Sequence, residues 1–321
     1  MARKSARPGS GGRYRSILVP LDGSPLSEQA LPLATAIAVR ARARLRLVLV
    51  HQLPAIPLSA EGRQLYLSLD LAARKSEKEY LEAFTDQLKK RFPSLAITAT
   101  IPAGPVAPVL RQYVQENRID LVVMTSRGRG GLQRLWLGSV ADAMIRTSAV
   151  PVLLVRPEEN PSPRPVLENL SQILVPLDRS AVAETILGPV TELASLAGAE
   201  LMLVEVIQPL ASPLEGPSAP SRFDAELTRL RREESANYLS GVAEECLKAG
   251  VKATYSAPLG PNVAEVILRL SESSTVGMIA LATRGRGGVK RLALGSVADK
   301  VVRTAPCPTM VYRPPAGTKR R

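Results

Sequence analysis

The chain has 321 residues, a length that suggests two domains at about 150 residues each. Hydrophobic residues make up 45% and charged residues 22% of the sequence, which excludes a wholly disordered, collagen-like or coiled-coil chain. No apolar stretch reaches the roughly 18 residues of a membrane span, and the basic N-terminal residues lack the apolar core of a signal peptide. We therefore expect a cytoplasmic protein without a membrane partner.

The net charge of +13 is concentrated at the two ends of the chain. Residues 1–15 and 313–321 contain Lys and Arg but no acidic residue, and together they carry nine of the thirteen charges. Their Gly, Pro and Ser content predicts disordered basic tails at 1–12 and 315–321. Aromatic residues are only 3% of the chain, too few for a platform that stacks bases, so we do not expect nucleic acid as a partner.

Short apolar runs and helical patterns alternate along the first half. The runs expected to form strands are 17–21, 45–50, 95–101, 121–125 and 152–155. Near-continuous Val, Ile and Leu suit strands that are buried on both faces of a parallel sheet. Between two of these runs, Val106, Val109 and Leu110 recur at the three- and four-residue spacing of a helix.

The second half repeats the first. Residues 17–22 and 173–178 both read ILVPLD, and residues 127–147 match 284–304 at 15 of 21 positions. Because the period of about 156 residues is that of a whole domain, the repeat indicates a duplication and not a solenoid.

The duplication predicts the organisation of the chain. We expect a first domain at 13–157, a Pro-rich linker at 158–170 and a second domain at 171–314. Strand–helix alternation with short connections predicts an α/β fold: two tandem doubly wound, Rossmann-like domains, each with a five-stranded parallel sheet flanked by helices. Ligands of such sheets bind beyond the carboxyl ends of the strands, where the strand order reverses.

An aspartate ends the first strand of each copy. Asp22 stands after the first run, and Asp178 is its counterpart. Such an Asp either closes the turn and caps the next helix, or presents its carboxylate to a ribose, an adenine or a metal ion, and both interpretations stay open. The duplication retains the Asp but replaces Gly23 by Arg179.

A glycine-rich segment follows the fourth strand of each copy. The two segments read Thr125-Ser-Arg-Gly128, nine residues, Gly138-Ser139, and Ala282-Thr-Arg-Gly285, nine residues, Gly295-Ser296. A glycine-rich turn can point amide groups at an anion, and a helix that opens at Gly138 presents the positive end of its dipole. The shared spacing predicts a phosphate site, although the chain contains neither G-x-x-x-x-G-K-[ST] nor an intact G-x-G-x-x-G after the first strand.

On these residues the chain resembles a tandem universal stress protein of the ATP-binding type. The motif of that type is Gly-x2-Gly-x9-Gly-[Ser/Thr], with an Asp at the end of the first strand. The resemblance covers the chain apart from its tails and linker, and it departs at the first motif glycine, which is Thr125 or Ala282 here. It implies a fold like that of the adenine nucleotide alpha hydrolases. The implied cofactor is ATP, ADP or AMP, and Mg2+ would be held through the phosphates, with no protein ligand set assigned.

The resemblance implies one nucleotide site in each copy. In the first copy the implied residues are Pro20, Asp22, Val50, Met124, Thr125, Gly128, Gly138, Ser139 and Val140. In the second copy they are Pro176, Asp178, Val206, Leu281, Ala282, Gly285, Gly295, Ser296 and Val297. The flanking Arg127, Arg129, Arg284 and Arg286 are either solvated loop residues or phosphate contacts.

The sequence offers little for catalysis. The sole histidine, His51, follows Val50 and is replaced by Ile207 in the second copy, so we expect it to be structural. The motif contains no Lys of the Walker type. We assign no catalytic residue and expect at most slow ATP hydrolysis.

Three functions compete at this point. The first is a nucleotide-binding universal stress protein with a regulatory or stress-protective role. The second is an interaction scaffold that binds no nucleotide and whose basic tails contact polyanions or protein partners. The third, an ATP pyrophosphatase-like transferase, would need a Ser-Gly-Gly-x-Asp-Ser loop where this chain reads LDGSPLS.

The resemblance also implies how the copies assemble. The final strands, 152–155 and 309–312, would pair and join the two domains as an intramolecular pseudo-dimer. Pairing would cover an open sheet edge in each copy. A further homodimer would make a four-domain particle.

Overall fold

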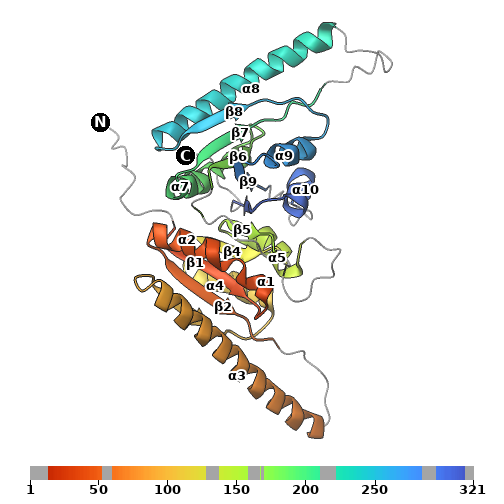
Figure 1. The fold of residues 1–321 in the computed structure, drawn as a ribbon. Coiled ribbons are helices and arrows are strands. Elements are labelled where there is room, and N and C mark those ends of the chain that lie inside the picture. The colour runs from red at the N-terminus through yellow and green to blue at the C-terminus, as the bar shows by residue number, and fades with distance from the viewer. Residues whose placement is uncertain are drawn as a thin grey trace, which may run out of the picture.

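The computed structural model describes residues 14–52, 60–127, 137–157, 167, 170–209, 222–283 and 294–314. The expected basic tails and most of the expected linker lie outside these residues. The described strands form one ten-stranded sheet in the order β3-β2-β1-β4-β5-β10-β9-β6-β7-β8. Figure 1 shows the two halves side by side, with the long helices α3 and α8 at opposite ends of the molecule.

The first half contributes strands β1 to β5 and helices α1 to α5. Its strands are β1 (Ser16–Leu21), β2 (Arg44–Leu49), β3 (Ile97–Thr100), β4 (Leu121–Thr125) and β5 (Val152–Val155). Its helices are α1 (Pro25–Glu28), α2 (Leu31–Ala41), α3 (Ala60–Arg91), α4 (Val106–Glu116) and α5 (Ser139–Thr147). All five residues of β4 are buried, as its unbroken apolar run predicts.

The second half repeats this order. Its strands are β6 (Gln172–Pro176), β7 (Glu200–Val204), β8 (Ala253–Ser256), β9 (Val276–Ala282) and β10 (Thr309–Tyr312). Its helices are α6 (Ala181–Glu184), α7 (Leu187–Ala197), α8 (Arg222–Lys248), α9 (Val263–Ser271) and α10 (Ser296–Thr304). Within each half the paired strands are parallel, so the structure confirms the predicted doubly wound α/β fold with five strands per copy.

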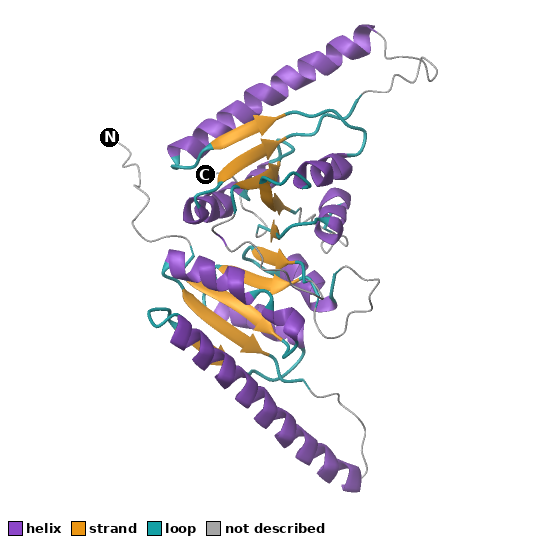
Figure 2. Ribbon diagram, viewed as in Figure 1, coloured by secondary structure: helices purple, strands orange, loops and turns teal. Residues whose placement is uncertain are grey.

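Helices cover both faces of the sheet, as Figure 2 shows. Helices α2, α3, α7 and α8 pack on one face, and their buried residues form a single cluster with alternate strand residues such as Ile17 and Val19. Helices α4, α5, α9 and α10 pack on the other face, where Leu18 and Met124 lie. Alternate strand residues point to opposite faces, so each core extends through both halves.

The two halves join at the centre of the sheet. Strand β5 pairs antiparallel with β10, with Leu153 opposite Met310. On the α2 face, the buried Tyr14 hydroxyl donates to the Pro189 carbonyl at 2.8 Å, and Arg40 donates to the Leu196 carbonyl at 2.9 Å. This pairing of the final strands confirms the expected pseudo-dimer and removes the edge that each copy would otherwise expose.

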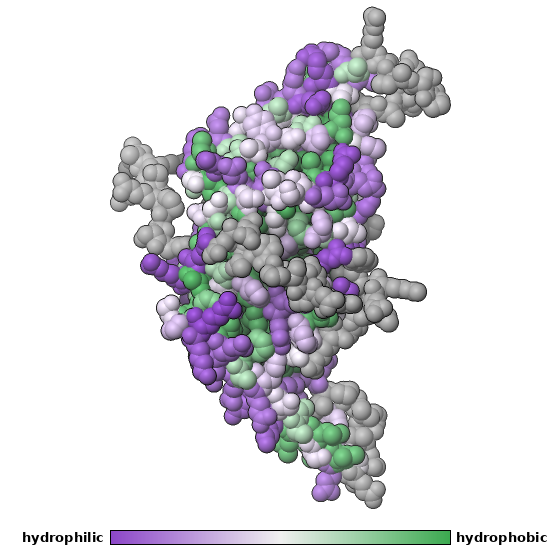
Figure 3. All heavy atoms as spheres, viewed as in Figure 1, coloured by the Kyte–Doolittle hydropathy of each residue, from purple (hydrophilic) through white to green (hydrophobic). Residues whose placement is uncertain are grey.

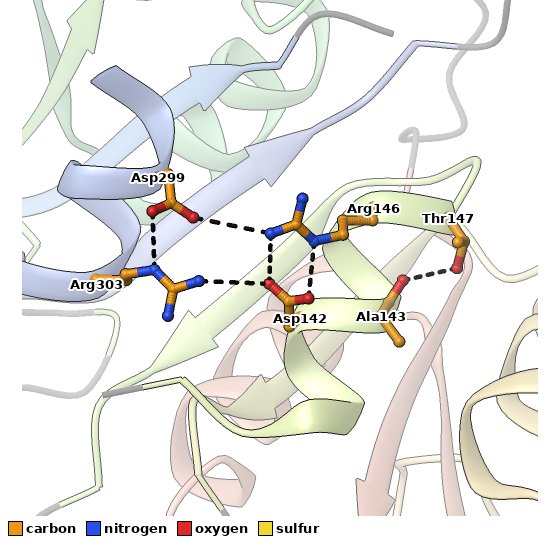
Figure 4. A network of polar contacts seen from close by, with 6 residues as sticks. All are labelled: Asp142, Ala143, Arg146, Thr147, Asp299 and Arg303. Atoms are coloured by element: carbon orange, nitrogen blue, oxygen red, sulfur yellow. Dashed lines mark hydrogen bonds and ion pairs between the residues drawn. The ribbon is translucent and has the colours of Figure 1, made fainter. Parts of the chain in front are cut away.

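On the opposite face, α5 and α10 meet through a square of four charges (Figure 4). Arg146 contacts Asp142 at 2.7 Å, and Arg303 contacts Asp299 at 2.9 Å, each within its own helix. Arg146 also lies 3.8 Å from Asp299, and Arg303 lies 3.8 Å from Asp142. Each carboxylate therefore faces an arginine of its own helix and one of the other copy.

The structure shortens one predicted strand. We expected a strand over 95–101, but β3 spans only Ile97–Thr100, and beyond it His51 and Ala103 form an isolated bridge. Three of its four residues are exposed because β3 is the edge of the sheet. The short helices α1 and α6, which directly follow Asp22 and Asp178, were not resolved by the sequence pattern, since four residues are too few to show a period.

Candidate functional site

The strand order reverses at β1 in the first half and at β6 in the second half. From β1 the chain continues outward to β2 and β3, whereas β4 and β5 lie on the other side. The same reversal places β6 between β7 and β9. The predicted site residues that the structure describes lie at or just beyond the carboxyl ends of β1, β2 and β4 and of β6, β7 and β9, or at the start of α5 and α10. Doubly wound sheets bind ligands at this edge.

Both aspartates close a turn. Asp22 Oδ1 accepts hydrogen bonds from the Ser24 amide at 2.9 Å and from the Ser24 hydroxyl at 2.6 Å, and Ser24 Oγ accepts from the Ser27 amide at 3.2 Å. In the second copy Asp178 Oδ1 accepts from the amide and hydroxyl of Ser180 in the same way. The turn-closing interpretation is therefore correct for one oxygen of each carboxylate.

The next residue shows how the second copy tolerates an arginine in the place of Gly23. Both residues have positive φ, 75° for Gly23 and 61° for Arg179. Residues other than glycine rarely adopt this backbone conformation. The Arg179 guanidinium contacts Glu205 at 2.9 Å and lies over the ring of Tyr238 at 5.9 Å. These contacts offset the backbone strain, so the turn keeps one shape with two different residues.

The loop after β4 is tied to its own backbone. The Gly138 amide donates to the Ser126 carbonyl at 2.7 Å, and the Thr125 hydroxyl donates to the Arg127 carbonyl at 2.7 Å. Arg127 is half-buried, whereas Gly128 and Arg129 lie outside the described residues. The amide of Gly138 is thus engaged within the chain and does not point at a ligand.

Helix α5 begins directly after Gly138 with no side-chain cap. Its first internal backbone bond runs from the Asp142 amide to the Gly138 carbonyl at 2.9 Å. The earlier amides, those of Ser139 and Val140 among them, belong to the first turn and have no partner within the helix. They point beyond the helix N-terminus with the positive end of its dipole.

Helix α10 repeats this start with a different backbone. Gly295 precedes Ser296, again with no side-chain cap, and the Asp299 amide donates to the Gly295 carbonyl at 2.9 Å. Gly295 has φ of +89°, a conformation that favours glycine, whereas Gly138 has φ of −72°, which any residue adopts. Arg284, Gly285 and Arg286 lie outside the described residues.

The predicted apolar residues gather on one face of the sheet. In the first copy Met124 belongs to the α4–α5 core, and Val50 and Val140 pack against it. In the second copy Leu281 belongs to the same core cluster, with Val206 and Val297 against it. Pro20 and Pro176 are half-buried in β1 and β6, and strand alternation points them to this face.

The side chains of Thr125 and Ala282, which replace the first motif glycine, point to the opposite face of the sheet. Ala282 packs against the core on the α7–α8 face, and alternation from Met124 turns the Thr125 side chain to the corresponding face. The added Cβ atoms therefore take no room from the face that gathers Val50 and Met124.

His51 occupies a different environment, on the α3 side. Its side chain is 3% exposed; Nδ1 lies 2.7 Å from Glu77 Oε2, and Nε2 lies 2.8 Å from Asp70 Oδ1. Asp70 also accepts from Arg74 Nε at 2.8 Å. The hydrogen bonds from Arg74 and His51 lower the pKa of the Asp70 carboxyl and keep it charged.

Sequence reasoning missed this cluster of His51, Asp70, Arg74 and Glu77. The three helical members resemble an ordinary charged helix face, and only the packing of α3 on β2 brings them to His51. No spacing between residue 51 and residues 70–77 could have predicted the contact.

Three further features bear on what the site can do chemically: the Cys307 thiol, possible metal ligands and possible membrane spans. Burial raises the pKa of Cys307 to about 11, so its thiol stays protonated at neutral pH, as expected for a structural cysteine. In the described part of the chain, no group of three His, Cys, Asp or Glu side chains is arranged to hold a metal ion. None of the described helices combines the length and apolar character needed to cross a membrane.

The fold and site together define a class: duplicated Rossmann-like domains with an Asp turn and an uncapped helix N-terminus in each copy. The model of the universal stress protein family matches the chain twice, over residues 13–156 and 169–313. The chain belongs to the universal stress protein family, in its tandem form.

Curated relatives and solved structures agree with this membership. One universal stress protein of Mycobacterium tuberculosis is 28% identical over 64% of this chain and 66% of its own length. Another from the same organism is 27% identical over 93% of this chain and 95% of the relative. Universal stress protein structures from Archaeoglobus fulgidus and Pseudomonas aeruginosa cover 95% and 94% of this chain, with 19% and 17% identity and TM-scores of 0.65 and 0.66. The matched regions make up 100% and 94% of those two chains, which share the fold of this protein.

Proposed function

We propose that this protein binds an adenine nucleotide in each copy and acts as a regulatory or stress-protective protein, with ATP hydrolysis slow or absent. The observation that carries the proposal is the pair of uncapped helix N-termini, at Ser139 and Ser296, beside the points where the strand order reverses. Phosphate groups bind at such N-termini because the amides and the helix dipole both favour an anion.

Two further features support a nucleotide over a simple anion. On the α4–α5 face, Val50, Met124 and Val140 offer an apolar surface for an adenine, and their counterparts do so in the second copy. Asp22 and Asp178 stand at the neighbouring strand ends, where a carboxylate can accept from ribose hydroxyls. Mg2+, where it accompanies the nucleotide, would be held through the phosphates, and we assign no set of protein ligands to it.

The arrangement favours binding over turnover. Each Asp already accepts two hydrogen bonds in its turn, and His51 is held between two carboxylates of α3. We therefore do not propose Asp22, Asp178 or His51 as a general base for an attacking water. We assign these residues to binding and structure.

The proposal is tested by equilibrium binding of a fluorescent ATP analogue. Ser139→Asp combined with Ser296→Asp places a carboxylate in the first turn of α5 and α10, which suits the helix dipole and therefore preserves the fold. We expect this variant to lose binding at least tenfold by charge repulsion, with an unchanged or raised melting temperature. Equal binding by the wild type and the double Asp variant would refute the phosphate assignment.

A second pair of variants separates the two copies. A valine at Gly138 places its Cβ 3.4 Å from the Ser126 carbonyl oxygen, directly before the first turn of α5. Gly138→Val should reduce the stoichiometry from two nucleotides to one, and Gly138→Val with Gly295→Val should abolish binding. Gly241→Ala is the matched control, since Gly241 lies within α8 and an added Cβ there meets nothing within 4 Å.

Native mass spectrometry distinguishes the scaffold alternative. Adenine nucleotide that stays bound through purification supports the proposal. A protein that carries no nucleotide and binds none at millimolar ATP would instead be a scaffold of the same fold.

A further inference from the structure

One cavity lies outside the proposed nucleotide sites. It has a volume of about 420 Å3 and lies between α3 and the ends of β2 and β3. Tyr66, Leu67 and Pro105 give it apolar walls. Its polar lining consists of His51, Gln52, Asp70 and Arg74. The nucleotide residues gather on the α4–α5 face, so this cavity has its own lining.

A relay of charged contacts, formed by the buried His51 with the more exposed Asp70, Glu77 and Arg74, makes up one wall. Both ring nitrogens of His51 contact carboxylates, at 2.7 Å from Glu77 and 2.8 Å from Asp70. Both contacts are hydrogen bonds only when each nitrogen carries a proton, since a carboxylate oxygen can only accept. The remaining oxygen of Asp70 accepts from Arg74 Nε at 2.8 Å.

The relay fixes the guanidinium of Arg74 by one edge. Among the residues that the structure describes, Arg74 makes its hydrogen bond through Nε, and no bond is found to its two terminal nitrogens. Those terminal nitrogens form the edge that binds a carboxylate in a planar, bidentate manner. An arginine that is already oriented loses less side-chain entropy when it binds an anion.

We propose that this cavity binds a small organic carboxylate, held by Arg74 and with an apolar body against Tyr66, Leu67 and Pro105. A single negative charge suits the site better than a phosphate dianion, because Asp70 and Glu77 already place two carboxylates near Arg74. The apolar walls select a ligand with a hydrocarbon or aromatic body over an inorganic anion.

The second copy supplies an internal comparison. The shift of 158 residues that matches the core residues Leu81 and Leu239 also matches Arg74 with Arg232, which lines a cavity of about 730 Å3 beside α8. Thr228 and Ile207 replace Asp70 and His51 there, so the residues at those two positions cannot form an equivalent of the relay with Arg232. We therefore assign the carboxylate site to the first copy alone.

The test uses the full chain and benzoate as the probe, with binding followed by isothermal titration calorimetry and saturation-transfer NMR. We expect one benzoate per chain, at least tenfold weaker binding of benzyl alcohol and of inorganic phosphate, and a loss of at least tenfold in Arg74→Met. Arg232→Met is the matched control and should bind benzoate as the wild type does. Wild-type affinity in Arg74→Met, or equal loss in Arg232→Met, would overturn the assignment.

Asp70→Asn separates orientation from net charge. Removal of a negative charge beside an anion site should strengthen benzoate binding if only electrostatics mattered. We expect weaker binding instead, because the variant releases the Arg74 guanidinium, and a gain in affinity would contradict the positioning role of Asp70. The fluorescent ATP analogue should bind Arg74→Met as it binds the wild type, and benzoate should not displace it. Displacement would show that both ligands use one site and would refute a separate cavity.

Discussion

At the scale of single residues, two equivalent glycines leave room for the helix that follows each of them. Gly104 and Gly260 occupy equivalent positions before α4 and α9, and both approach a valine of the helix that follows. A Cβ on Gly260 would lie 2.3 Å from Val266 Cγ2, well inside van der Waals contact. Val266 is buried in the helix, where a β-branched side chain has essentially one rotamer and cannot turn away.

Two Gly→Ala changes should have opposite effects on the free energy of unfolding. Gly260→Ala should lower the free energy of unfolding by about 1–3 kcal/mol through overpacking. Gly241→Ala, in the exposed interior of α8, should raise it by up to about 1 kcal/mol, because alanine is the better helix former. Urea denaturation measures both, and a stable Gly260→Ala variant would show that Val266 can move.

At the scale of elements, α5 and α10 connect the copies just behind the proposed phosphate sites. Asp142 and Asp299 sit in the first turn of their helices and also accept from Arg146 and Arg303 (Figure 4). All four side chains are partly exposed, so water and salt weaken the square.

A double-mutant cycle measures the contact between the copies. Asp142→Asn combined with Arg303→Gln should show a coupling energy of about 0.5 kcal/mol at low salt, which falls towards zero near 1 M NaCl. The pair of Lys75→Gln with Glu79→Gln is the control, because that exposed contact on α3 lies at 3.9 Å within one helix. A coupling that does not change with salt would argue that packing, and not charge, joins α5 to α10.

The two long helices also differ at the element scale. Four leucines of α3, Leu65, Leu67, Leu69 and Leu71, are strongly exposed, and Figure 3 shows apolar residues at that end of the molecule. Among its described residues, helix α8 has two comparable leucines, Leu230 and Leu247, which lie far apart along the helix. The inner face of α3 carries Asp70 and Glu77, so the contact with His51 holds this half of the helix against β2.

At the scale of the whole molecule, the copies form one body. A single sheet and two continuous cores extend through both halves, and the hydroxyl of Tyr14, at the start of the first copy, is bonded to the second copy in α7. Because the cores are shared, we expect the halves to unfold together and not as independent domains.

Tyr14→Phe tests this junction. The change leaves the buried Pro189 carbonyl without its donor and should lower the free energy of unfolding by about 1–2 kcal/mol. Tyr255→Phe, an exposed residue of β8, should change it by less than 0.5 kcal/mol, as surface substitutions generally do. Two separate transitions in thermal unfolding of the wild type would contradict a shared core.

Much of this architecture follows from local pattern. Strands β4, β5 and β10 were predicted with the observed bounds because all their residues are buried and most of them are apolar. The repeat of ILVPLD and of the Gly-Ser spacing predicted two copies of one domain, and the Asp turns follow from Asp, Ser and the helix that they cap. Strand β3 was predicted too long, since an exposed edge strand has no apolar run to define its ends.

The sequence by itself therefore determined the duplication and the α/β class, because these depend on periodicity and on spacing between near neighbours, and it indicated where we propose the site. Only the tertiary structure decided that the Gly138 amide is bonded to Ser126, that His51 lies between Asp70 and Glu77, and that Arg146 faces Asp299. Such contacts join residues that no local pattern relates, and they exist only once helices pack on the sheet and the copies pack on each other.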